Sequence, residues 1–327
     1  MALEIVQILA AGTFGHVAVV IDTATGALYA AKVLKQEHLE NVKLVRRVRD
    51  EAVLLSRLDH PNIVRSGGIR EIAGRPVVLL EWVRGAPLDA LLVRHPDGLP
   101  VAEACEIVRI SAAALAAAYD SLDPVSRVPM RVIHRDFKPS NVLLSVDGVV
   151  KVLDFGIAKG TFAGKLSETI TIVLGAHGYL APERLDGADD APAGDVYAIG
   201  CSLFELLTTR RMKLSLHPQD HVERMQRELM RMRPAATNPR TLHDLTALIT
   251  AMCAYDPAAR PTHGEVIDAL SRILVTAGLT PDLPRLARKH VIPHLEHQSL
   301  ENPRTHPAYP DLAFLQTPTG ETPPTAP

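Results

Sequence analysis

The sequence carries no excess of charge of either sign. Its 327 residues include 35 Lys and Arg against 37 Asp and Glu, a formal net charge of -2. Proteins whose main role is to bind nucleic acids or anionic membranes usually display a basic surface. The balance lends no support to either role, so we expect neither nucleic acid nor membrane among the partners.

Long hydrophobic runs are missing as well. No uninterrupted apolar stretch approaches the roughly 20 residues that a membrane-spanning helix requires. The first residues, MALEIVQIL, contain an acidic residue and no basic cluster, which is not the pattern of a signal peptide. We expect a cytoplasmic protein with no membrane segment in this chain.

Cysteine is scarce. The three cysteines, Cys105, Cys201 and Cys253, are far apart in the sequence, and none forms a C-x-x-C pair. This spacing argues against a disulfide framework or a zinc site and favours buried, reduced thiols. Internal repeats are not visible either.

What is present is a chain that is 47% hydrophobic and changes its patterning along its length. Residues 1–33 and 75–83 have the apolar patterns of strands, and residues 40–58 have helical spacing. The stretch RGAP at 84–87 interrupts this region, and we place a boundary there. Beyond it, helical patterns cover residues 101–122, 194–208 and 241–254.

These patterns predict one region over residues 1–83 and another over residues 84–275. The composition then changes, because ten of the 25 prolines lie in residues 276–327. Such a segment is not expected to form a packed core, so we predict that it is largely disordered or extended. It could bind a partner or be a plain solvated extension.

A glycine-containing stretch, ILAAGTFGHVAVV at residues 8–20, raises the first question of function. Gly12 and Gly15 are followed by strand-like alternation, so they mark a hairpin tip. A dinucleotide-binding fingerprint would need a helix there, and a P-loop would need G-K-[ST]. Glycines at a hairpin tip allow backbone N–H groups to approach phosphates, but a loose hairpin explains the stretch equally well.

Four further motifs decide between these readings. They are YAAK at 29–32, VIHRDFKPSNVLL at 132–144, VLDFG at 152–156 and YLAPE at 179–183. Their order and spacing are those of the protein-kinase signature set. Over about residues 3–275 the chain resembles a serine/threonine protein kinase of the bacterial eukaryotic-like (Hanks-type) family. The resemblance implies an α+β, two-lobed fold, with a small β-rich N-lobe containing one key helix and a larger, mainly helical C-lobe.

The resemblance implies four catalytic residues. Lys32 would hold the α- and β-phosphates of ATP, and Glu51 would pair with Lys32. Glu51 lies beside the apolar stripe of its helix, where a carboxylate needs a partner. Asp136 would orient the substrate hydroxyl and accept its proton, and Lys138 would neutralise the γ-phosphate.

Two residues are expected to bind a metal. Asn141 and Asp154 would ligate Mg²⁺, with Mn²⁺ as an alternative, because hard cations prefer oxygen ligands. The pattern K-P-x-N, which begins at Lys138, resembles the catalytic loop of serine/threonine kinases rather than that of tyrosine kinases. We give His134 a packing role and no chemistry.

The nucleotide site implied by the resemblance includes apolar side chains around adenine, with Leu80 as the gatekeeper. The backbone of Glu81 and Val83 would contact the edge of the base. The full set of expected nucleotide-binding residues is Leu9, Gly12, Phe14, Gly15, Val17, Ala30, Lys32, Leu80, Glu81, Val83 and Leu143.

A regulatory site and two scaffold contacts complete the resemblance. Arg135 would pair with a phosphorylated residue of the loop at about 157–178, for which we favour Thr171 and then Thr169. Asp195 would hold the backbone of the catalytic loop. Glu183 and Arg260 would form a structural ion pair.

Three positions depart from the family pattern. Ala10 stands where the first glycine of the loop usually occurs. Ala176 stands where the family usually has a threonine whose hydroxyl forms hydrogen bonds to the catalytic aspartate and lysine. Loss of this hydroxyl could lower the rate of phosphoryl transfer. Ser66 stands at an expected apolar position against Leu55, His134 and Phe155.

Three functions are compatible with these residues. The first is an active, autophosphorylating kinase that transfers the γ-phosphoryl group of ATP to protein serine and threonine. The second is a pseudokinase that binds nucleotide with little transfer, and the third is a small-molecule phosphotransferase. The segments APE and DVYAIG favour a protein substrate, because they resemble the peptide-docking platform of protein kinases.

Overall fold

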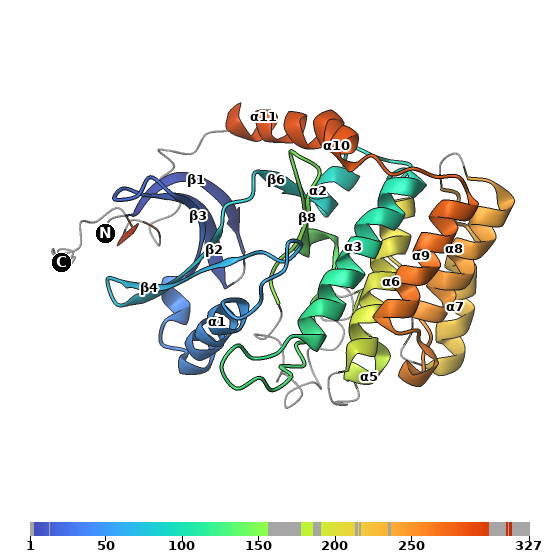
Figure 1. Ribbon diagram of the computed structural model, residues 1–327, viewed down its shortest axis with the longest axis horizontal. Coiled ribbons are helices and arrows are strands. Elements are labelled where there is room, and N and C mark those ends of the chain that lie inside the picture. Colours follow the sequence, from blue (N-terminus) through green and yellow to red (C-terminus); the bar gives the residue numbers. More distant parts are fainter. Residues whose placement is uncertain are drawn as a thin grey trace. The chain divides into compact units, whose positions relative to one another are not determined.

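The computed structural model describes residues 3–12, 14–155, 178–185, 191–212, 215, 217–234, 237–300, 312 and 314–315. The contacts divide the chain into two units (Figure 1). The first comprises Met1–His60, Val64–Arg84 and Glu296–Pro327, and the second comprises Pro61–Ile63 and Gly85–Leu295. The change from the first unit to the second after Arg84 lies one residue from the boundary expected from sequence.

The first unit contains a five-stranded antiparallel sheet in the order β1-β2-β3-β5-β4. The strands are β1 (Leu3–Ala11), β2 (Gly15–Asp22), β3 (Leu28–Leu34), β4 (Ser66–Ile72) and β5 (Arg75–Glu81). Successive side chains of a strand point to opposite faces, so the alternating valines and alanines of β2 and β3 divide between two faces. The centre of one face, with Ala18, Val20, Ala31 and Val33, is buried, and the other face carries Lys32.

Helix α1 (Val42–Leu55) covers part of the sheet in the same unit and contacts β4 and β5. Asn41 caps its N-terminus, because the side-chain oxygen accepts a hydrogen bond from the backbone N–H of Leu44 at 3.1 Å. The buried stripe of the helix contains Val48, Ala52 and Leu55, together with one carboxylate, Glu51. This helix is the one expected over residues 40–58.

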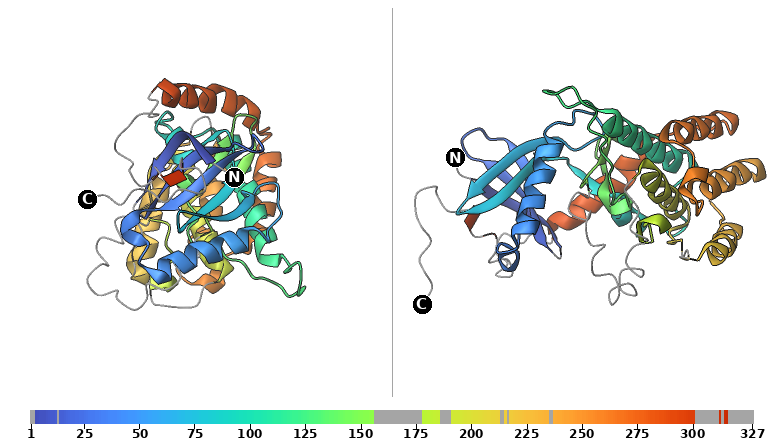
Figure 2. Two further views of the ribbon diagram at one scale, coloured as in Figure 1. Left: turned by 90° about the vertical axis from the view of Figure 1, so that its left-hand side faces the viewer. Right: turned by 90° about the horizontal axis from the view of Figure 1, so that it is seen from below.

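The second unit is mainly helical. Its longer helices are α3 (Val101–Asp120), α6 (Pro192–Thr208), α7 (Pro218–Met230), α8 (Pro239–Met252) and α9 (His263–Thr276), and its short helices are α2 (Leu88–Leu92) and α5 (Pro182–Leu185). Helix α3 packs against α6 and α9, and α8 packs against both of these helices (Figure 2). A three-stranded sheet in the order β6-β7-β8 is formed by Gly85–Pro87, Val142–Ser145 and Val150–Val152.

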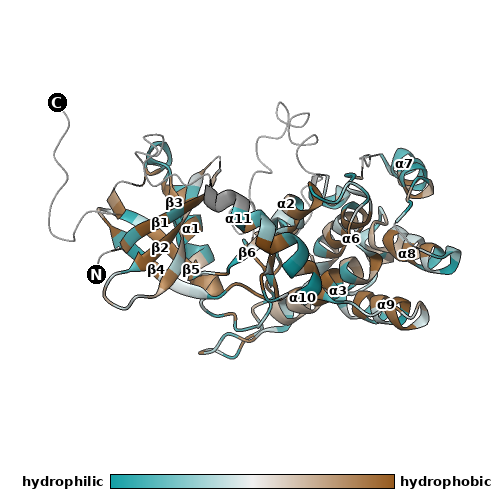
Figure 3. Cartoon of the chain, turned by 90° about the horizontal axis from the view of Figure 1, so that it is seen from above, coloured by the Kyte–Doolittle hydropathy of each residue, from teal (hydrophilic) through white to brown (hydrophobic). Residues whose placement is uncertain are grey.

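The hydropathy of the helices follows their burial. Helix α6 is mainly apolar and almost entirely buried, whereas α7 buries only His221, Met225 and Leu229. Figure 3 shows this contrast as brown on α6 and a larger share of teal on α7. A helix that is apolar on all sides occupies the centre of a bundle, whereas an amphipathic helix lies at its margin.

The segment at 276–327 differs from expectation. It contains the short helix α10 (Leu283–Leu286), a π-helical turn (Ala287–Val291) and α11 (Ile292–Leu300). Residues of α10 and the π-helical turn are buried, and near the end of the chain Leu312, Phe314 and Leu315 are buried too. Its prolines do not prevent packing where they stand at a helix start, as Pro284 does.

The cysteine and membrane expectations can be checked on the described residues. All three cysteines are free and buried. Within the described ranges, no helix is long and apolar enough to cross a bilayer. The same ranges contain no group of three or more His, Cys, Asp or Glu side chains arranged to hold a metal ion.

We predict that acid destabilises the second unit in part through His290. Burial, and then the neighbouring His95, Lys289 and Arg94, lower the pKa of His290 from 6.5 to about 4. The unfolded chain therefore takes up a proton at this residue first, and stability should fall as the pH drops from about 6.5 towards 4. Melting temperatures across this range should fall less steeply for His290→Gln. The exposed His243→Gln is the control, and equal slopes for both variants would contradict the prediction.

Candidate active site

The predicted partner of Lys32 is present in the first unit. The Nζ atom of Lys32 lies 3.2 Å from Oε1 and 3.4 Å from Oε2 of Glu51. The Glu51 side chain is only 7% exposed, whereas that of Lys32 is 30% exposed. A buried carboxylate held by a half-exposed ammonium orients that ammonium and leaves part of it accessible to an anion.

The residues around Lys32 on its face of the sheet are those expected at the adenine. Val17 lies opposite Lys32 across the β2–β3 pair, and Ala30 lies opposite Leu80 across the β3–β5 pair. Val17 and Ala30 are half-buried. Leu80 is 8% exposed. One face of the sheet thus combines a paired lysine with small and apolar side chains.

The glycine hairpin lies between β1 and β2, as expected. The backbone N–H of Gly12 donates to the carbonyl of Gly15 at 2.8 Å, and Phe14 between them is 49% exposed. The Phe14 ring packs near the His38 ring, with centroids 5.5 Å apart. Ala10 pairs with Val17 as a residue of β1, directly after an irregularity in the register of the two strands between Ile8 and Ala10.

The two glycines of the hairpin are required for different reasons. A Cβ atom on Gly15 would lie 2.3 Å from the carbonyl oxygen of Val33, so β3 itself excludes a side chain there. A Cβ atom on Gly12 would meet nothing closer than the Gly15 oxygen at 3.5 Å, an ordinary contact. Packing among the described residues therefore explains the glycine at position 15 but does not explain the glycine at position 12.

We therefore predict opposite effects for two similar substitutions. Gly15→Ala should lower the melting temperature of the chain, because the methyl group collides with the backbone of β3. Gly12→Ala should leave the melting temperature unchanged and weaken ATP binding, because it obstructs only the loop tip. Calorimetry and a fluorescent-nucleotide titration would measure the two effects, and equal ATP affinity for Gly12→Ala and wild type would contradict the role of Gly12.

Two polar contacts in this unit modify the expectations from sequence. The backbone N–H of Glu81 donates to the carbonyl of Arg65 at 2.9 Å. The base-reading group of Glu81 would therefore be its carbonyl. The hydroxyl of Ser66 donates to the carbonyl of Ala52 on α1 at 3.4 Å and accepts from the N–H of Gly68 at 3.1 Å. Ser66 thus links β4 to α1 by one hydrogen bond, and its hydroxyl also accepts one from within β4.

In the second unit, a buried carboxylate fixes the backbone at His134 and Arg135, just before Asp136. Asp195, near the start of α6, is 3% exposed. Its two oxygens accept hydrogen bonds from the backbone N–H groups of His134 at 2.7 Å and Arg135 at 2.9 Å. A single carboxylate that satisfies two consecutive N–H groups holds this turn in one conformation.

Arg135 and Asp154 adopt left-handed backbone conformations, with φ of 67° and 47°. This conformation is uncommon for residues other than glycine, and for arginine it must be maintained by surrounding contacts. The Nη1 atom of Arg184 donates to the carbonyl of Arg135 at 2.6 Å. Arg184 and Asp195 therefore fix the two peptide groups on either side of the Arg135 Cα atom. Arg184 was not foreseen, although it directly follows Glu183 of the APE motif.

His134 has the packing role expected of it. Its side chain is fully buried, and its ring lies 4.7 Å from the Phe155 ring, centroid to centroid. Nε2 lies 2.8 Å from the carbonyl of Leu153, and Nδ1 accepts from the N–H of Asp136 at 3.2 Å. Burial lowers the pKa of His134, so the ring is neutral and donates through Nε2.

Asp136, Lys138 and Asn141 form one hydrogen-bonded cluster. Lys138 Nζ lies 3.1 Å from Asp136 Oδ2, and Asn141 Nδ2 donates to the same oxygen at 3.1 Å. The Asn141 Nδ2 atom also donates to the backbone carbonyl of Asp136 at 2.8 Å. The carboxylate is 16% exposed, so it is held in place while part of it faces solvent.

The residues that could hold a divalent cation are Asn141 of this cluster and Asp154. Both hydrogen bonds of Asn141 use its NH₂ group, so its Oδ1 is the atom that suits a hard cation. The N–H of Leu153 donates to the backbone carbonyl of Asn141 at 2.8 Å, which places Asp154 one residue from this contact. Two oxygen ligands match Mg²⁺, which commonly takes one or two protein ligands and completes its shell with phosphates and water.

The scaffold ion pair is present in the second unit. Arg260 donates from Nη1 and Nη2 to the two carboxylate oxygens of Glu183, both at 2.7 Å. The Arg260 side chain is fully buried and also donates to the backbone carbonyls of Ala193, Ala254 and Tyr255. These contacts connect the APE segment to α6 and to the segment before α9.

Some expected residues cannot be placed. Thr169, Thr171 and Ala176 lie outside the described residues. Of the remaining nucleotide-binding candidates, Leu9 is half-buried on β1, and Val83 is half-buried just beyond β5. Leu143 belongs to β7 of the second unit, where it pairs with Lys151 and Pro87.

The family of the chain follows from comparison with known proteins. A family model described as the protein kinase domain matches residues 3–270. The chain therefore belongs to the protein kinase domain family, and its fold is the α+β kinase fold expected from sequence.

The curated relatives are bacterial serine/threonine-protein kinases. PknA of Mycobacterium tuberculosis is 33% identical over 210 residues, which cover 63% of this chain and 46% of the relative. PrkC of Bacillus subtilis is 30% identical over 81% of this chain and 39% of its own length. PknB of Mycobacterium leprae is 32% identical over 86% of this chain and 44% of its own length. The chain thus spans less than half the length of these relatives.

Solved structures support the fold. The crystal structure of the Mycobacterium tuberculosis PknI kinase domain matches with a TM-score of 0.60 and 25% identity, over 83% of this chain and 96% of that one. A second crystal structure of the same kinase domain matches with a TM-score of 0.62 and 24% identity, over 84% and 96% of the two chains.

Proposed function

We propose that the chain is an active serine/threonine protein kinase that transfers the γ-phosphoryl group of ATP to protein hydroxyl groups. The observation that carries this proposal is the cluster in which Lys138 and Asn141 both contact Oδ2 of Asp136. Membership of the kinase family and relatives named as serine/threonine-protein kinases support it.

The proposed reaction divides the work among a few side chains. The serine or threonine oxygen forms a bond to the γ-phosphorus, the bond from this phosphorus to the β–γ bridging oxygen breaks, and ADP leaves. Asp136 accepts the proton of the hydroxyl, and Lys138 compensates the charge of the transferring group. Most of the rate enhancement in such a reaction comes from positioning and charge stabilisation.

We propose ATP with Mg²⁺ as the cosubstrate, and Mn²⁺ as a substitute. Asn141 and Asp154 would hold the cation, which when bound neutralises phosphate charge. Lys32, oriented by Glu51, would bind the α- and β-phosphates. Val17, Ala30 and Leu80 would contact the adenine, and Gly12, Gly15 and Phe14 would lie over the phosphates.

One assay separates this function from its alternatives. The chain is incubated with γ-labelled ATP and Mg²⁺, together with a generic basic protein or with small-molecule acceptors. Label on protein supports the kinase, nucleotide binding without transfer supports the pseudokinase, and label on small molecules alone supports a small-molecule phosphotransferase. We expect label on protein, because the relatives are named as protein kinases and because Asp136, Lys138 and Asn141 form one hydrogen-bonded cluster.

Lys32→Met provides a matched test of phosphate binding. We expect transfer to fall by about 10²–10³-fold, the loss that follows removal of one preorganised charge from a transition state. Lys43→Met, on the exposed face of α1, is the control and should keep wild-type activity. Transfer by Lys32→Met at the rate of the control would show that Lys32 does not serve the reaction.

We also propose that the chain phosphorylates itself on Thr171, and secondarily on Thr169. A phosphate on this segment would offer charge-assisted hydrogen bonds to Arg135, whose backbone is held by Asp195 and Arg184. Mass spectrometry after incubation with ATP should locate the phosphate. A fully active enzyme with both threonines unmodified would contradict the proposal.

The identity of the protein substrates and a cytoplasmic location remain predictions.

A further inference from the structure

The face of the five-stranded sheet opposite Lys32 is unusually apolar. We call it the apolar sheet face, and it consists of Leu3, Ala18, Val20, Ala31, Val33, Val77 and Leu79. These residues are at most 3% exposed, and Ile5, Ile8, Tyr29 and Ile72 extend the cluster at its edges. A sheet of this kind needs a second layer to bury its face.

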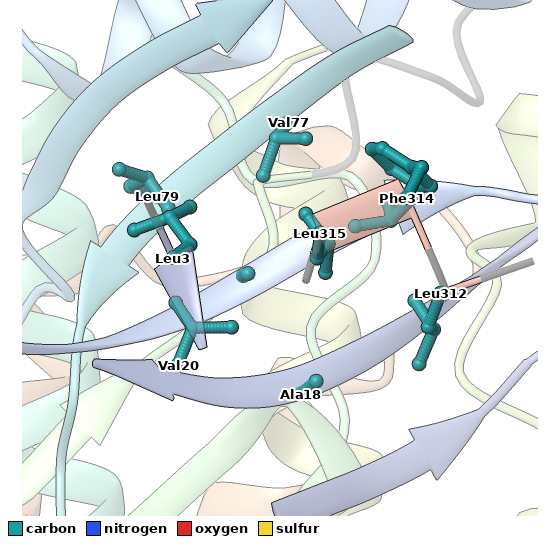
Figure 4. Packing of buried hydrophobic residues seen from close by; sticks show 10 residues of the cluster. Leu3, Ala18, Val20, Val77, Leu79, Leu312, Phe314 and Leu315 are labelled. Carbon is teal, nitrogen blue, oxygen red and sulfur yellow. The ribbon is translucent and has the colours of Figure 1, made fainter. Parts of the chain in front are cut away.

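The second layer comes from the far end of the chain. Leu312, Phe314 and Leu315 pack on the apolar sheet face, and all three are buried, with exposures of 1%, 8% and 1%. Figure 4 shows them beside Val77 on β5 and facing the side chains of β1 and β2. The Phe314 ring also lies under the guanidinium group of Arg75, with 4.5 Å between the Cζ atom of Arg75 and the ring centroid.

The docked residues are distinct from their surroundings in sequence. They form the pattern Leu-x-Phe-Leu in a segment that ends in TPTGETPPTAP, which contains no large apolar side chain. Large apolar residues in such a segment are unexpected unless they bind something. The match to the kinase domain ends at residue 270, so these residues lie beyond the part that the family accounts for.

We infer that the apolar sheet face is a docking site for a Leu-x-Phe-Leu segment, and that its occupant is the chain's own residues 312–315. Residues 301–311 connect α11 to this segment, and short connections give effective concentrations of about millimolar. A site of micromolar intrinsic affinity would therefore be occupied within the chain. The inference concerns the first unit alone and does not depend on phosphoryl transfer.

Two truncated chains test the inference. Residues 1–315 keep the docking segment and residues 1–311 lack it, while both lack the proline-rich end. We expect 1–311 to melt about 4 °C or more below 1–315, because it exposes the apolar sheet face to water. Equal melting temperatures, together with no binding of the peptide described next, would overturn the inference.

A labelled peptide of residues 308–318 then measures docking directly. It should bind 1–311 at least about tenfold more tightly than 1–315, in which the attached segment competes. Binding should raise the melting temperature of 1–311, and a peptide with Phe314→Ala and Leu315→Ala should bind at least about tenfold more weakly. Equal affinity for the two truncated chains would show that the peptide binds elsewhere and would overturn the inference.

A milder variant covers the case in which 1–311 does not fold. Full-length Phe314→Ala should show faster amide hydrogen exchange in β2 and β3 than wild type. Leu28→Ala, which removes an exposed side chain from β3, is the control and should not do so. Unchanged exchange in Phe314→Ala would overturn the inference. Self-association of 1–311 that is reversed by adding the peptide would support the inference.

Discussion

Asp136→Asn should lower the rate of phosphoryl transfer by about 10²–10⁴-fold, the usual contribution of a positioned general base. The amide has nearly the same shape as the carboxylate but cannot accept the hydroxyl proton, and it removes the negative charge beside Lys138. ATP affinity and melting temperature should remain close to those of wild type, because Asp136 is partly exposed and is not a core residue. Single-turnover kinetics with γ-labelled ATP would measure the loss.

A matched substitution distinguishes this role from a general effect of charge. Asp268→Asn removes a carboxylate from the exposed side of α9 in the same unit and should keep the wild-type rate. The role assigned to Asp136 would be wrong if both variants transferred phosphate at equal rates. A rate loss accompanied by a large drop in melting temperature would point instead to a structural role.

Glu183→Ala should destabilise the second unit by about 3–5 kcal/mol, the cost of leaving one charge of a buried pair without its partner. Arg260 is fully buried, and its remaining contacts would be neutral backbone carbonyls and the face of the Tyr197 ring, none of which carries the negative charge needed to balance the guanidinium. For a unit of this size the melting temperature should fall by about 6–20 °C. Differential scanning calorimetry would measure this change.

A double-mutant cycle checks the cause. If the uncompensated guanidinium is responsible, Glu183→Ala combined with Arg260→Met should be more stable than Glu183→Ala alone, because no buried charge remains. Additive losses from the two substitutions would contradict this account. The exposed pair Arg46–Asp50 on α1 is a useful contrast, because breaking a solvent-exposed pair should cost at most about 1 kcal/mol.

The structure shows the surroundings of two of the three positions that depart from the family pattern. Ala10 keeps its pairing with Val17 in β1, next to an irregularity in the strand register, so the alanine is compatible with the hairpin. Ser66 makes hydrogen bonds to Ala52 and Gly68. Ala176 lies outside the described residues, and its effect on the rate stays a prediction.

Local patterns predicted much of the fold. The helices expected over 40–58 and 101–122 are α1 and α3, and their ends differ by only a few residues. The expectation did not include α7 and α9. For α9 a signal was available, since Thr262 and Glu265 form a capping box directly before its apolar stripe. Because residues 276–327 are rich in proline, we predicted neither α10 and α11 nor the packing of Leu312, Phe314 and Leu315.

The sequence by itself predicted which side chains would carry the chemistry, because motif spacing is a property of the chain. The resemblance to the kinase family also indicated Glu51 as the partner of Lys32, and helical spacing placed this carboxylate beside a buried stripe, where it needs a counter-charge. Only the tertiary structure decided three contacts between distant residues that no motif indicated. Arg184 reaches the carbonyl of Arg135, Val33 excludes a side chain at Gly15, and residues near the C-terminus cover the first sheet. No local pattern encodes these contacts, because each depends on where two separate segments meet in space.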